Sequence, residues 1–197
     1  PADLFERPIP AFIEQQIQSA YQRIQTFQDC WQRPQIEQFV ACDYRVVYQM
    51  LDWVVEERLP PGRRFLEWGS GFAIVTCLAS ALGFDAIGIE SEEELIQQSF
   101  ITATAFNEPV QLLHGNFLPE GSESLAGGQP LNSVGHPIAP AYAQIDAELS
   151  DFACVFSYPW PGEDWFHCDV FDRYAAAGAI HCLFLGPYEI MVRRKWG

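Results

Sequence analysis

The chain has 197 residues, of which 49% are hydrophobic and 19% are charged. This composition is typical of one folded globular domain and excludes a disordered chain, because it provides enough apolar surface for a full core. The formal net charge of −15 argues against a nucleic-acid substrate, since proteins that follow a phosphate backbone need a basic face. A neutral or cationic substrate suits such a surface better.

No apolar run approaches the roughly 18 residues that a membrane span requires, and the N-terminus lacks the pattern of a secretory signal. The six cysteines show no C-x-x-C spacing, so we expect reduced thiols and neither disulfides nor a metal site. These features predict a soluble, cytoplasmic protein that does not associate with membranes. Because the chain begins with Pro1 and not with methionine, we also expect a processed or trimmed form.

Residues 1–62 are expected to form an N-terminal helical extension packed on a core of residues 63–197, within a single domain overall. Apolar side chains at helical spacing predict one amphipathic helix over residues 9–27 and a second over residues 34–58. The Pro-Pro-Gly sequence at 60–62 ends the second helix, because proline cannot continue it.

The core begins with a pattern of strand, glycine turn, helix and strand. We place the first strand at 64–68, the helix at 72–82 and the second strand at 85–90. Gly83 ends the helix as a residue in the left-handed conformation. Two such strands are parallel neighbours, so the glycine turn and Glu90 are expected side by side at the carboxyl edge of the sheet, where open α/β sheets bind ligands.

The residue types at this edge indicate a nucleoside-containing ligand. Gly69 and Gly71, with Ser70 between them, allow backbone amides to approach a ligand closely. Glu90 follows Gly69 by 21 residues and is suited to accept hydrogen bonds from the hydroxyls of a ribose. Glu67 would repel a pyrophosphate, whereas it would suit an ammonium group.

The sequence EWGSG at 67–71 resembles the first motif, [D/E]-x-G-x-G, of the class I S-adenosylmethionine-dependent methyltransferases. The resemblance implies a Rossmann-like, doubly wound α/β fold and S-adenosyl-L-methionine as cofactor. It also implies that Glu67 lies near the amino-acid end of the cofactor, that the turn backbone packs on it, and that Glu90 holds the ribose. The third small position of the motif, usually glycine, is Ala73.

A third strand is expected at 110–113, after a helix that Ser91 caps and Glu94 completes as a capping box. The resemblance places a polar side chain at the end of this strand, near the adenine amine. Asn116 could supply that hydrogen bond and Phe117 a ring contact.

The start of the second N-terminal helix is another candidate cofactor contact, because in the family it can cover the cofactor. Asp43 and Tyr44 are therefore candidate lid residues. The other interpretation is a surface acid and a packed aromatic side chain.

Residues 118–150 are rich in glycine and proline and too long for an ordinary connection. We expect a loop excursion whose part 127–140 is mobile and lies near the active-site face. The sheet resumes with a continuous apolar strand at 151–156, typical of the centre of a parallel sheet.

This fourth strand ends in Ser157-Tyr158-Pro159-Trp160, similar to the [D/N/S]-P-P-[Y/F/W] motif of the amine-methylating branches of the family. The resemblance implies that Ser157 accepts a hydrogen bond from the target amine and that Trp160 packs on it. Tyr158 replaces the first proline of the motif. An ordinary proline-rich turn with a packed aromatic ring is the alternative.

The C-terminal part predicts a helix at 163–177 and strands at 180–185 and 188–194. The link at 186–187 is so short that the last strand must return antiparallel, which gives a sheet of about six strands. Asp164, with Glu163 and Tyr158, is a candidate proton acceptor if the target is an amine.

The sequence therefore predicts an S-adenosylmethionine-dependent methyltransferase that acts on an unidentified small-molecule or protein substrate, with nucleic acid unlikely as a partner. Two alternatives stay open. One is a non-catalytic, methyltransferase-like binding domain. The other, less favoured, is an oxidoreductase using NAD or FAD, which the glycine turn and Glu90 would allow but which Glu67 and the missing third glycine oppose. The oligomeric state is not predicted.

Overall fold

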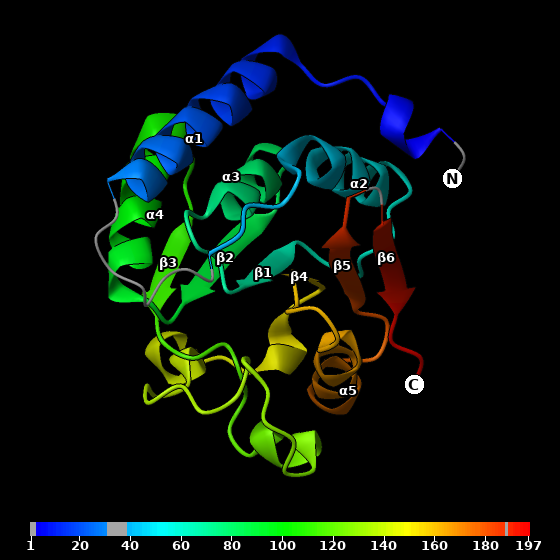
Figure 1. Ribbon diagram of the computed structural model, residues 1–197. Coiled ribbons are helices and arrows are strands. Elements are labelled where there is room, and N and C mark those ends of the chain that lie inside the picture. The colour runs from blue at the N-terminus through cyan, green and yellow to red at the C-terminus, as the bar shows by residue number, and fades with distance from the viewer. Residues whose placement is uncertain (1–2, 31–38, 188) are drawn as a thin grey trace.

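The computed structural model describes residues 3–30, 39–187 and 189–197, and their centre is a six-stranded sheet (Figure 1). Its strand order is β3-β2-β1-β4-β5-β6, with β1 to β5 parallel and β6 antiparallel to β5. The strands are β1 Arg64–Trp68, β2 Asp85–Glu90, β3 Gln111–His114, β4 Cys154–Ser157, β5 Ile180–Gly186 and β6 Glu189–Arg194. The mostly parallel sheet with an antiparallel end, expected from the sequence, is confirmed.

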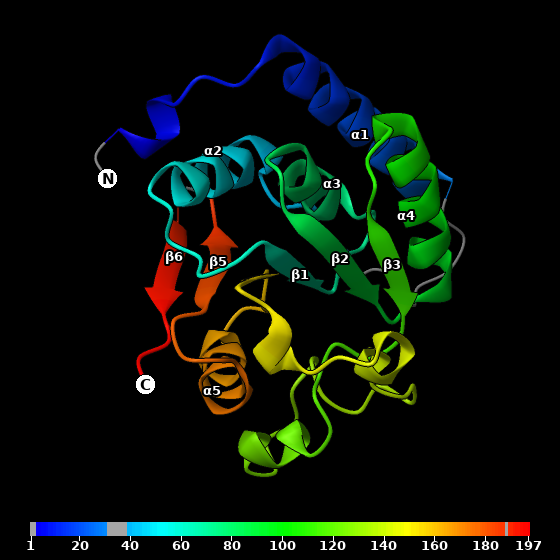
Figure 2. The same ribbon diagram turned by 180° about the vertical axis from the view of Figure 1, so that it is seen from behind.

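Helices cover both faces of the sheet, but unequally. The helices are α1 Ala11–Asp29, α2 Tyr44–Glu56, α3 Ile74–Ala81, α4 Glu93–Phe106 and α5 Asp164–Tyr174. One face carries α2, α3 and α4, with α1 outside α3 and α4 (Figures 1 and 2). The other face carries α5 and a long irregular segment with short 3-10 turns. Among the described residues, the 3-10 turns are Leu4–Glu6 before α1, and Ser122–Ala126, Ala141–Ile145 and Leu149–Asp151 in the irregular segment.

The helix expected over 34–58 begins later than the apolar spacing indicates. Residues 34–38 lie outside the described residues, residues 39–43 are not helical, and α2 begins at Tyr44. Asp43 is its N-cap, and its side chain accepts hydrogen bonds from the backbone N–H of Arg45 and Val46 at 3.0 and 3.3 Å. An N-cap carboxylate satisfies amides that have no partner within the helix, so Asp43 sets the helix start.

The N-cap expected for the helix after β2 is also wrong. The helix α4 begins at Glu93 with Glu92 as N-cap and no side-chain capping bond, so Ser91 does not cap it. The reason lies in β2, because the Glu90 carboxylate accepts the backbone N–H of Glu92 at 2.9 Å. The carboxylate thereby holds the chain in an extended path for two residues beyond the strand.

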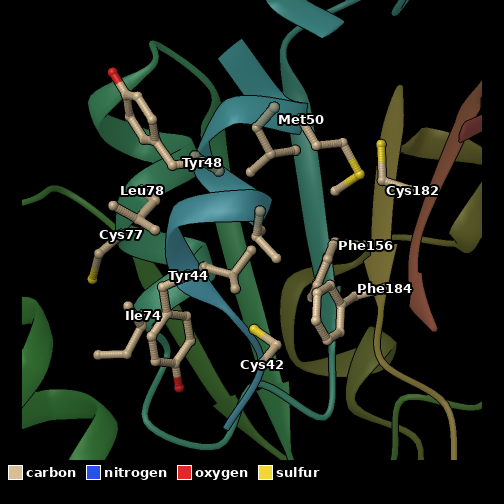
Figure 3. Packing of buried hydrophobic residues seen from close by; sticks show 14 of the residues in the cluster. Cys42, Tyr44, Tyr48, Met50, Ile74, Cys77, Leu78, Phe156, Cys182 and Phe184 are labelled. Atoms are coloured by element: carbon tan, nitrogen blue, oxygen red, sulfur yellow. The ribbon is translucent and has the colours of Figure 1, made fainter. Parts of the chain in front are cut away.

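The main core lies between the sheet and α2 and α3 (Figure 3). Tyr44 from α2 lies beside Ile74 of α3, while Met50, also from α2, lies beside Cys182 of β5. Each fully buried large side chain of this kind contributes roughly 1.5–3 kcal/mol to folding. This layer fixes α3, and with it the glycine turn that precedes α3.

A second core on the opposite face supports the irregular segment between β3 and β4. Phe166 and Phe171 of α5 pack with Val155 and with Leu118 and Tyr142 of that segment. The backbone N–H of Asn116 bonds to Ala139 O at 2.9 Å, and Ala141 N–H bonds back to Asn116 O at 2.9 Å. Residues 139–141 are thus tied to the end of β3, and the mobility expected for 127–140 stays a prediction.

The described residues contain no helix that is both long and apolar enough to cross a bilayer. All six cysteines are free, and no group of three potential metal ligands gathers within the part of the chain that the structure describes. Of the helices in residues 1–62, α2 packs directly on the sheet, and α1 packs outside α3 and α4. The division into an extension and a core stays a prediction.

Candidate functional site

A pocket opens at the carboxyl edge of the sheet, beside the turn that follows β1. It holds about 860 Å³ of empty space, a volume that includes the open solvent at its mouth. Part of its lining comes from β1, β2 and the residues that follow them: Trp68, Gly69, Glu90, Ser91, Glu92 and Leu95. The rest comes from the segment before α2, the segment after β3, the end of β4 and α5: Phe39, Val40, Phe117, Asn132, Ser133, His136, Tyr158, Trp160 and His167.

The glycine turn needs glycine for two separate reasons. Gly69 and Gly71 both have positive φ, +64° and +53°, a region that side chains with a Cβ rarely adopt. A Cβ on Gly71 would lie 2.5 Å from Cε2 of Phe39, whereas a Cβ on Gly69 would have nothing within 4 Å. The turn is therefore open to the pocket at Gly69 and covered by an aromatic ring at Gly71.

Phe39 is the cover of the turn, and it stacks on Phe72 with 5.3 Å between ring centroids and 27° between planes. The sequence places Phe39 and Val40 inside a helix, so their position at the pocket was missed. Only the capping role of Asp43, which starts the helix later, could have indicated that they precede it.

Glu90 joins the turn to the pocket. Its Oε2 accepts the backbone N–H of Gly71 at 2.6 Å, and its Oε1 accepts that of Glu92 at 2.9 Å. Burial raises the pKa of Glu90, although the hydrogen bonds from Glu92 and Gly71 oppose the shift. Each carboxylate oxygen has a further lone pair, so this side chain can accept hydrogen bonds from two ligand hydroxyls without leaving its place.

Glu67 lies beneath the turn and is not part of the pocket lining. Its Oε2 accepts the backbone N–H of Thr76 at 2.7 Å and also the Thr76 hydroxyl. Both donors lie in the first turn of α3, where a carboxylate is favourable. Burial raises the pKa of Glu67 to about 8. Glu67 thus anchors α3 to β1, and its contact with a ligand ammonium stays a prediction.

Asn116 and Phe117, expected near the adenine, and Tyr44, expected to cover the cofactor, occupy different surroundings. Phe117 borders the pocket and stacks on Trp68, with 5.3 Å between centroids and 22° between planes. Asn116 is buried behind it, and its Oδ1 accepts the backbone N–H of Leu118 at 2.9 Å. Tyr44 lies in the main core against Tyr21, 5.1 Å between centroids. The structure brings only Phe117 of the three to the pocket wall, and their cofactor contacts stay predictions.

Of the four side chains expected at the methyl acceptor, two line the pocket and two do not. Tyr158 and Trp160 line the pocket. Ser157 is fully buried, with its Oγ 3.0 Å from Nε2 of His181 on β5. Asp164 begins α5 outside the pocket lining. Ser157 and Asp164 therefore do not meet Tyr158 and Trp160 at the pocket, and the catalytic roles of all four stay predictions.

A buried carboxylate fixes the part of the pocket lining formed by Asn132 and Ser133. Glu163 accepts four hydrogen bonds: from the backbone N–H and the Nδ2 of Asn132 at 2.6 and 3.1 Å, and from the backbone N–H and hydroxyl of Ser133 at 3.0 and 2.6 Å. Burial alone would raise the pKa of Glu163, but these donors together outweigh it, so the pKa is lowered. The carboxylate fastens the irregular segment to the start of α5.

His167 completes this wall one helical turn after Glu163. Its Nε2 lies 3.0 Å from the Ser133 Oγ, and its ring meets Trp68 and Phe117 at centroid distances of 5.6 and 5.5 Å. Burial lowers the pKa of His167 to about 4, so the imidazole is neutral at pH 7. The sequence contains no local signal for this contact, because Ser133 and His167 are separated by 34 residues.

No protein-family model matches the chain, and neither does any curated protein. Solved structures do match it. An RNA methyltransferase from Salinibacter ruber, in complex with S-adenosyl-L-homocysteine, is 15% identical over 76% of this chain and 82% of its own, with a TM-score of 0.52. The chain has the fold of the class I methyltransferases. A methyltransferase of Podospora anserina bound to S-adenosyl-L-homocysteine is 12% identical over 90% of this chain and 63% of its own, with a TM-score of 0.53.

A hypothetical protein of Thermus thermophilus is 16% identical over 80% of this chain and 90% of its own, with a TM-score of 0.52. Structural matches at identities this low establish the class I methyltransferase fold alone. The activity must be argued from the site. The fold expected from the sequence of 67–71 is confirmed. In this methyltransferase fold, the pocket lies at the carboxyl edge of β1 and β2, where open α/β sheets bind ligands.

Proposed function

We propose that the chain is a methyltransferase that uses S-adenosyl-L-methionine, held in the pocket between the turn after β1 and Glu90. The observation that carries this proposal is the buried Glu90 carboxylate. It borders the pocket and is fixed by two backbone amides, one on each of its oxygens. A buried acid at a pocket wall is costly to keep charged, and ligand hydroxyls would offset that cost.

The residues present fit this cofactor. Gly69 offers bare backbone to the pocket, because nothing lies within 4 Å of the Cβ position there. Glu90 would hold the ribose hydroxyls, while Phe39 and Phe117 add apolar ring surface to the pocket lining. When bound, the cofactor supplies an electrophilic methyl group on a sulfonium.

The protein contributes position and exclusion of water. Methyl transfer needs an acceptor atom in line with the methyl group at near-contact distance, and a fixed pocket supplies that alignment. Tyr158 and Trp160 line the end of the pocket nearest β4 and would confine the acceptor there. Burial raises the pKa of Tyr158, so its hydroxyl stays protonated and acts as a hydrogen-bond donor.

The acceptor is proposed to be a small molecule or a protein side chain. The Salinibacter ruber neighbour is an RNA methyltransferase, which makes RNA the alternative acceptor. Among the described residues that line the pocket there is neither lysine nor arginine, and the chain carries a net charge of −15. Both features disfavour a substrate that is bound through its phosphates.

A non-catalytic binding domain is the second candidate, favoured by one observation. The Ser157 hydroxyl, which the amine-methylating motif would present to a substrate, is occupied by His181 and fully buried. Cofactor binding without turnover would support this candidate.

Calorimetric titration tests the proposal, using S-adenosyl-L-methionine and S-adenosyl-L-homocysteine with NAD as control. We expect binding in the micromolar range that weakens about tenfold or more in Glu90→Ala, because two hydrogen bonds to a charged group are lost. Glu93→Ala, an exposed acid in the first turn of α4, is the matched control and should bind as the parent does. Binding of NAD alone, or of none of the three, would overturn the proposal.

A further inference from the structure

The outer edge of the sheet at β6 is a feature that the proposed function does not use. In both views β6 is the outermost strand, and β5 lies on its inner side (Figures 1 and 2). An edge strand carries backbone N–H and C=O groups along its outer side, and these groups can pair with a strand of another chain. The edge of β6 is therefore a candidate interaction surface.

The hydrogen bonds to β5 determine which backbone groups of β6 face outward. Lys195 N–H donates to Ala179 O at 2.9 Å, so the backbone groups of Lys195 face the β5 side. Successive residues of an antiparallel strand face alternate sides. The outward-facing residues of β6 are then Ile190, Val192 and Arg194. No backbone group from another described segment bonds to these three residues, so the edge is open to a partner strand.

The side chains of β6 are complementary to a second copy of the same strand. In an antiparallel pair with a two-fold axis at Met191, that residue meets its own copy, and Glu189 lies opposite Arg193 of the other chain. On the other face of the strand, Ile190 lies opposite Val192. Apolar pairs and pairs of opposite charge both stabilise antiparallel strands. Each pair also occurs twice, because a two-fold interface uses one surface on both chains.

A shift of the axis by one residue removes this match. With the axis at Val192, Ile190 would lie opposite Arg194, and Met191 would lie opposite Arg193. Each of these apolar side chains would then face a guanidinium. A parallel arrangement in register would place every charge beside its own copy, which is destabilising. The sequence of β6 therefore favours one antiparallel register.

The side chains at this edge are accessible. Met191 is 37% exposed, and Trp196, just beyond the end of β6, is 82% exposed. The guanidinium of Arg193 donates to Asp172 at 2.7 Å and has further N–H donors for a second carboxylate. Continuing the same register would place Trp196 opposite the 186–187 link of the second copy, where the aromatic ring would add apolar contact area.

The charge of this edge differs from that of the chain as a whole. The net charge of −15 makes two copies repel each other across acidic surfaces. By contrast, Arg193, Arg194 and Lys195 follow one another at the end of β6. Contact through β6 avoids the acidic surfaces, and the antiparallel direction keeps the basic ends of the two strands apart.

We propose that the chain forms a two-fold symmetric dimer in which β6 pairs with β6 of a second copy, antiparallel and with the axis at Met191. The two sheets then form one continuous sheet. None of the pocket-lining residues in the described ranges belongs to β6, so each copy keeps its own pocket. The inference does not depend on the proposed function.

The small size of the contact sets the expected affinity. The strand β6 has six residues, and interfaces that bury less than about 1,200 Å² are weak or transient. We therefore expect a reversible dimer with a dissociation constant of about 10 µM.

Analytical ultracentrifugation of the full chain tests the dimer, at concentrations from about 1 to about 200 µM, on both sides of that constant. Glu189→Arg turns both symmetric attractions into repulsions, so we expect dimerisation at least about tenfold weaker. Glu123→Arg, an exposed acid in the Ser122–Ala126 turn, changes the net charge equally and should dimerise as the parent does. A parent that stays monomeric throughout, or a dimer that Glu189→Arg leaves unchanged, would overturn the inference.

Disulfide trapping tests the register, in a Cys30→Ser background that removes an exposed thiol. Directly opposite residues that share no hydrogen bonds have Cα atoms about 4.5 Å apart, which a disulfide can span. Met191→Cys should therefore form a covalent dimer on mild oxidation. Glu189→Cys is the control and should not, because its own copy lies four residues away along the strand. Trapping of Glu189→Cys in preference to Met191→Cys would contradict the register.

Amide hydrogen exchange of the unmodified chain tests the backbone pairing. The outward N–H groups of Ile190 and Val192 should exchange about fivefold more slowly at about 200 µM than at about 2 µM, because dimerisation protects them. The N–H of Met191 faces β5 and should exchange slowly at both concentrations. Exchange at Ile190 and Val192 that does not depend on concentration would show that the edge stays unpaired and would overturn the inference.

Discussion

Two buried carboxylates, Glu67 and Glu90, lie near each other around the glycine turn, and the pKa of each is raised chiefly by burial. The charge of Glu90 raises the pKa of Glu67 further. Two acids buried at one site are costly when both are ionised. A bound cation, or ligand hydroxyls that donate to Glu90, would reduce this cost. The pair is therefore the residue-scale reason for placing a charged, hydroxyl-bearing cofactor here.

Glu67 should make the protein less stable as the pH rises. Its pKa is about 8 in the folded chain, against an ordinary 4.5, so the folded state holds a proton that the unfolded state has lost. That contribution to stability is complete below pH 4.5 and disappears as the pH rises through 8. Between pH 6 and 8 we expect a loss of about 2 kcal/mol, measured by urea unfolding. Glu67→Gln should lack this loss, and an unchanged slope in the variant would contradict it.

His167 should make the protein less stable as the pH falls. Its pKa is about 4 when folded and 6.5 ordinarily, so the unfolded chain binds a proton that the folded chain does not. The contribution is complete above pH 6.5 and is lost as the pH falls through 4, about 2 kcal/mol between pH 7 and 4.5. The check is the difference in acid-limb slope between the parent and His167→Gln. Equal slopes in the parent and in His167→Gln would refute the assignment.

At the scale of elements, the turn between β1 and α3 allows a matched pair of substitutions. Gly69 and Gly71 share positive φ, but only Gly71 has a neighbour, Phe39, within reach of a Cβ. Gly69→Ala should cost about 1 kcal/mol through backbone strain alone. Gly71→Ala should cost about 1 kcal/mol more, because the Phe39 ring must leave its stacking position on Phe72. Denaturant unfolding of both variants measures the difference, and equal losses would show that Phe39 does not cover Gly71.

The attachment of the irregular segment to α5 can be tested through Glu163. Removing its carboxylate in Glu163→Ala leaves Asn132 and Ser133 without their shared acceptor, at a cost of about 2 kcal/mol. The backbone amides of these two residues should then exchange hydrogen faster, while amides in β1 keep their protection. Asp169→Ala, an exposed acid on the same helix, is the control. Unchanged exchange at Asn132 and Ser133 in Glu163→Ala would show that other contacts hold the segment.

The elements differ in how far the sequence predicts them. The unit from β1 to β2 follows from local pattern, because an apolar run, glycines and an apolar helix succeed one another without interruption. The start of α2 does not, since Phe39 and Val40 extend the apolar spacing although Asp43 caps the helix after them. Apolar spacing records which face is buried and does not mark where a helix begins.

The candidate site was predictable where it lies at the ends of strands. Gly69, Glu90, Phe117, Tyr158 and Trp160 were expected at strand ends, and all five border the pocket. Contacts such as that of Ser133 with His167 join segments that no periodicity relates, because they depend on how the 118–150 segment folds across the sheet. Nothing in the sequence near Ser133 or His167 indicates that the fold brings their side chains together.

At the scale of the whole molecule, the charge distribution restricts the partner. The net charge is −15, and the basic side chains Arg7, Arg45 and Arg193 are each engaged in an ion pair with an acid. The chain has 11 lysines and arginines against 26 acids, so repulsion by the acids opposes binding along a phosphate backbone. A protein of this charge approaches neutral or cationic molecules more readily than nucleic acid.

The protein should not bind RNA at physiological salt. We expect a dissociation constant weaker than about 100 µM for a transfer-RNA-sized probe in about 150 mM salt, measured by fluorescence anisotropy. Micromolar binding that falls steeply with added salt would contradict this expectation. It would also make RNA, the substrate class of the Salinibacter ruber neighbour, the favoured acceptor.

The most direct test of the whole account is a crystal structure of the protein with S-adenosyl-L-homocysteine. We expect the ligand beside Gly69, with its ribose hydroxyls about 2.7–3.0 Å from the Glu90 carboxylate and its sulfur directed toward the end of the pocket lined by Tyr158 and His167. A ligand bound elsewhere on the chain, or within the pocket but without contact to Glu90, would contradict the account.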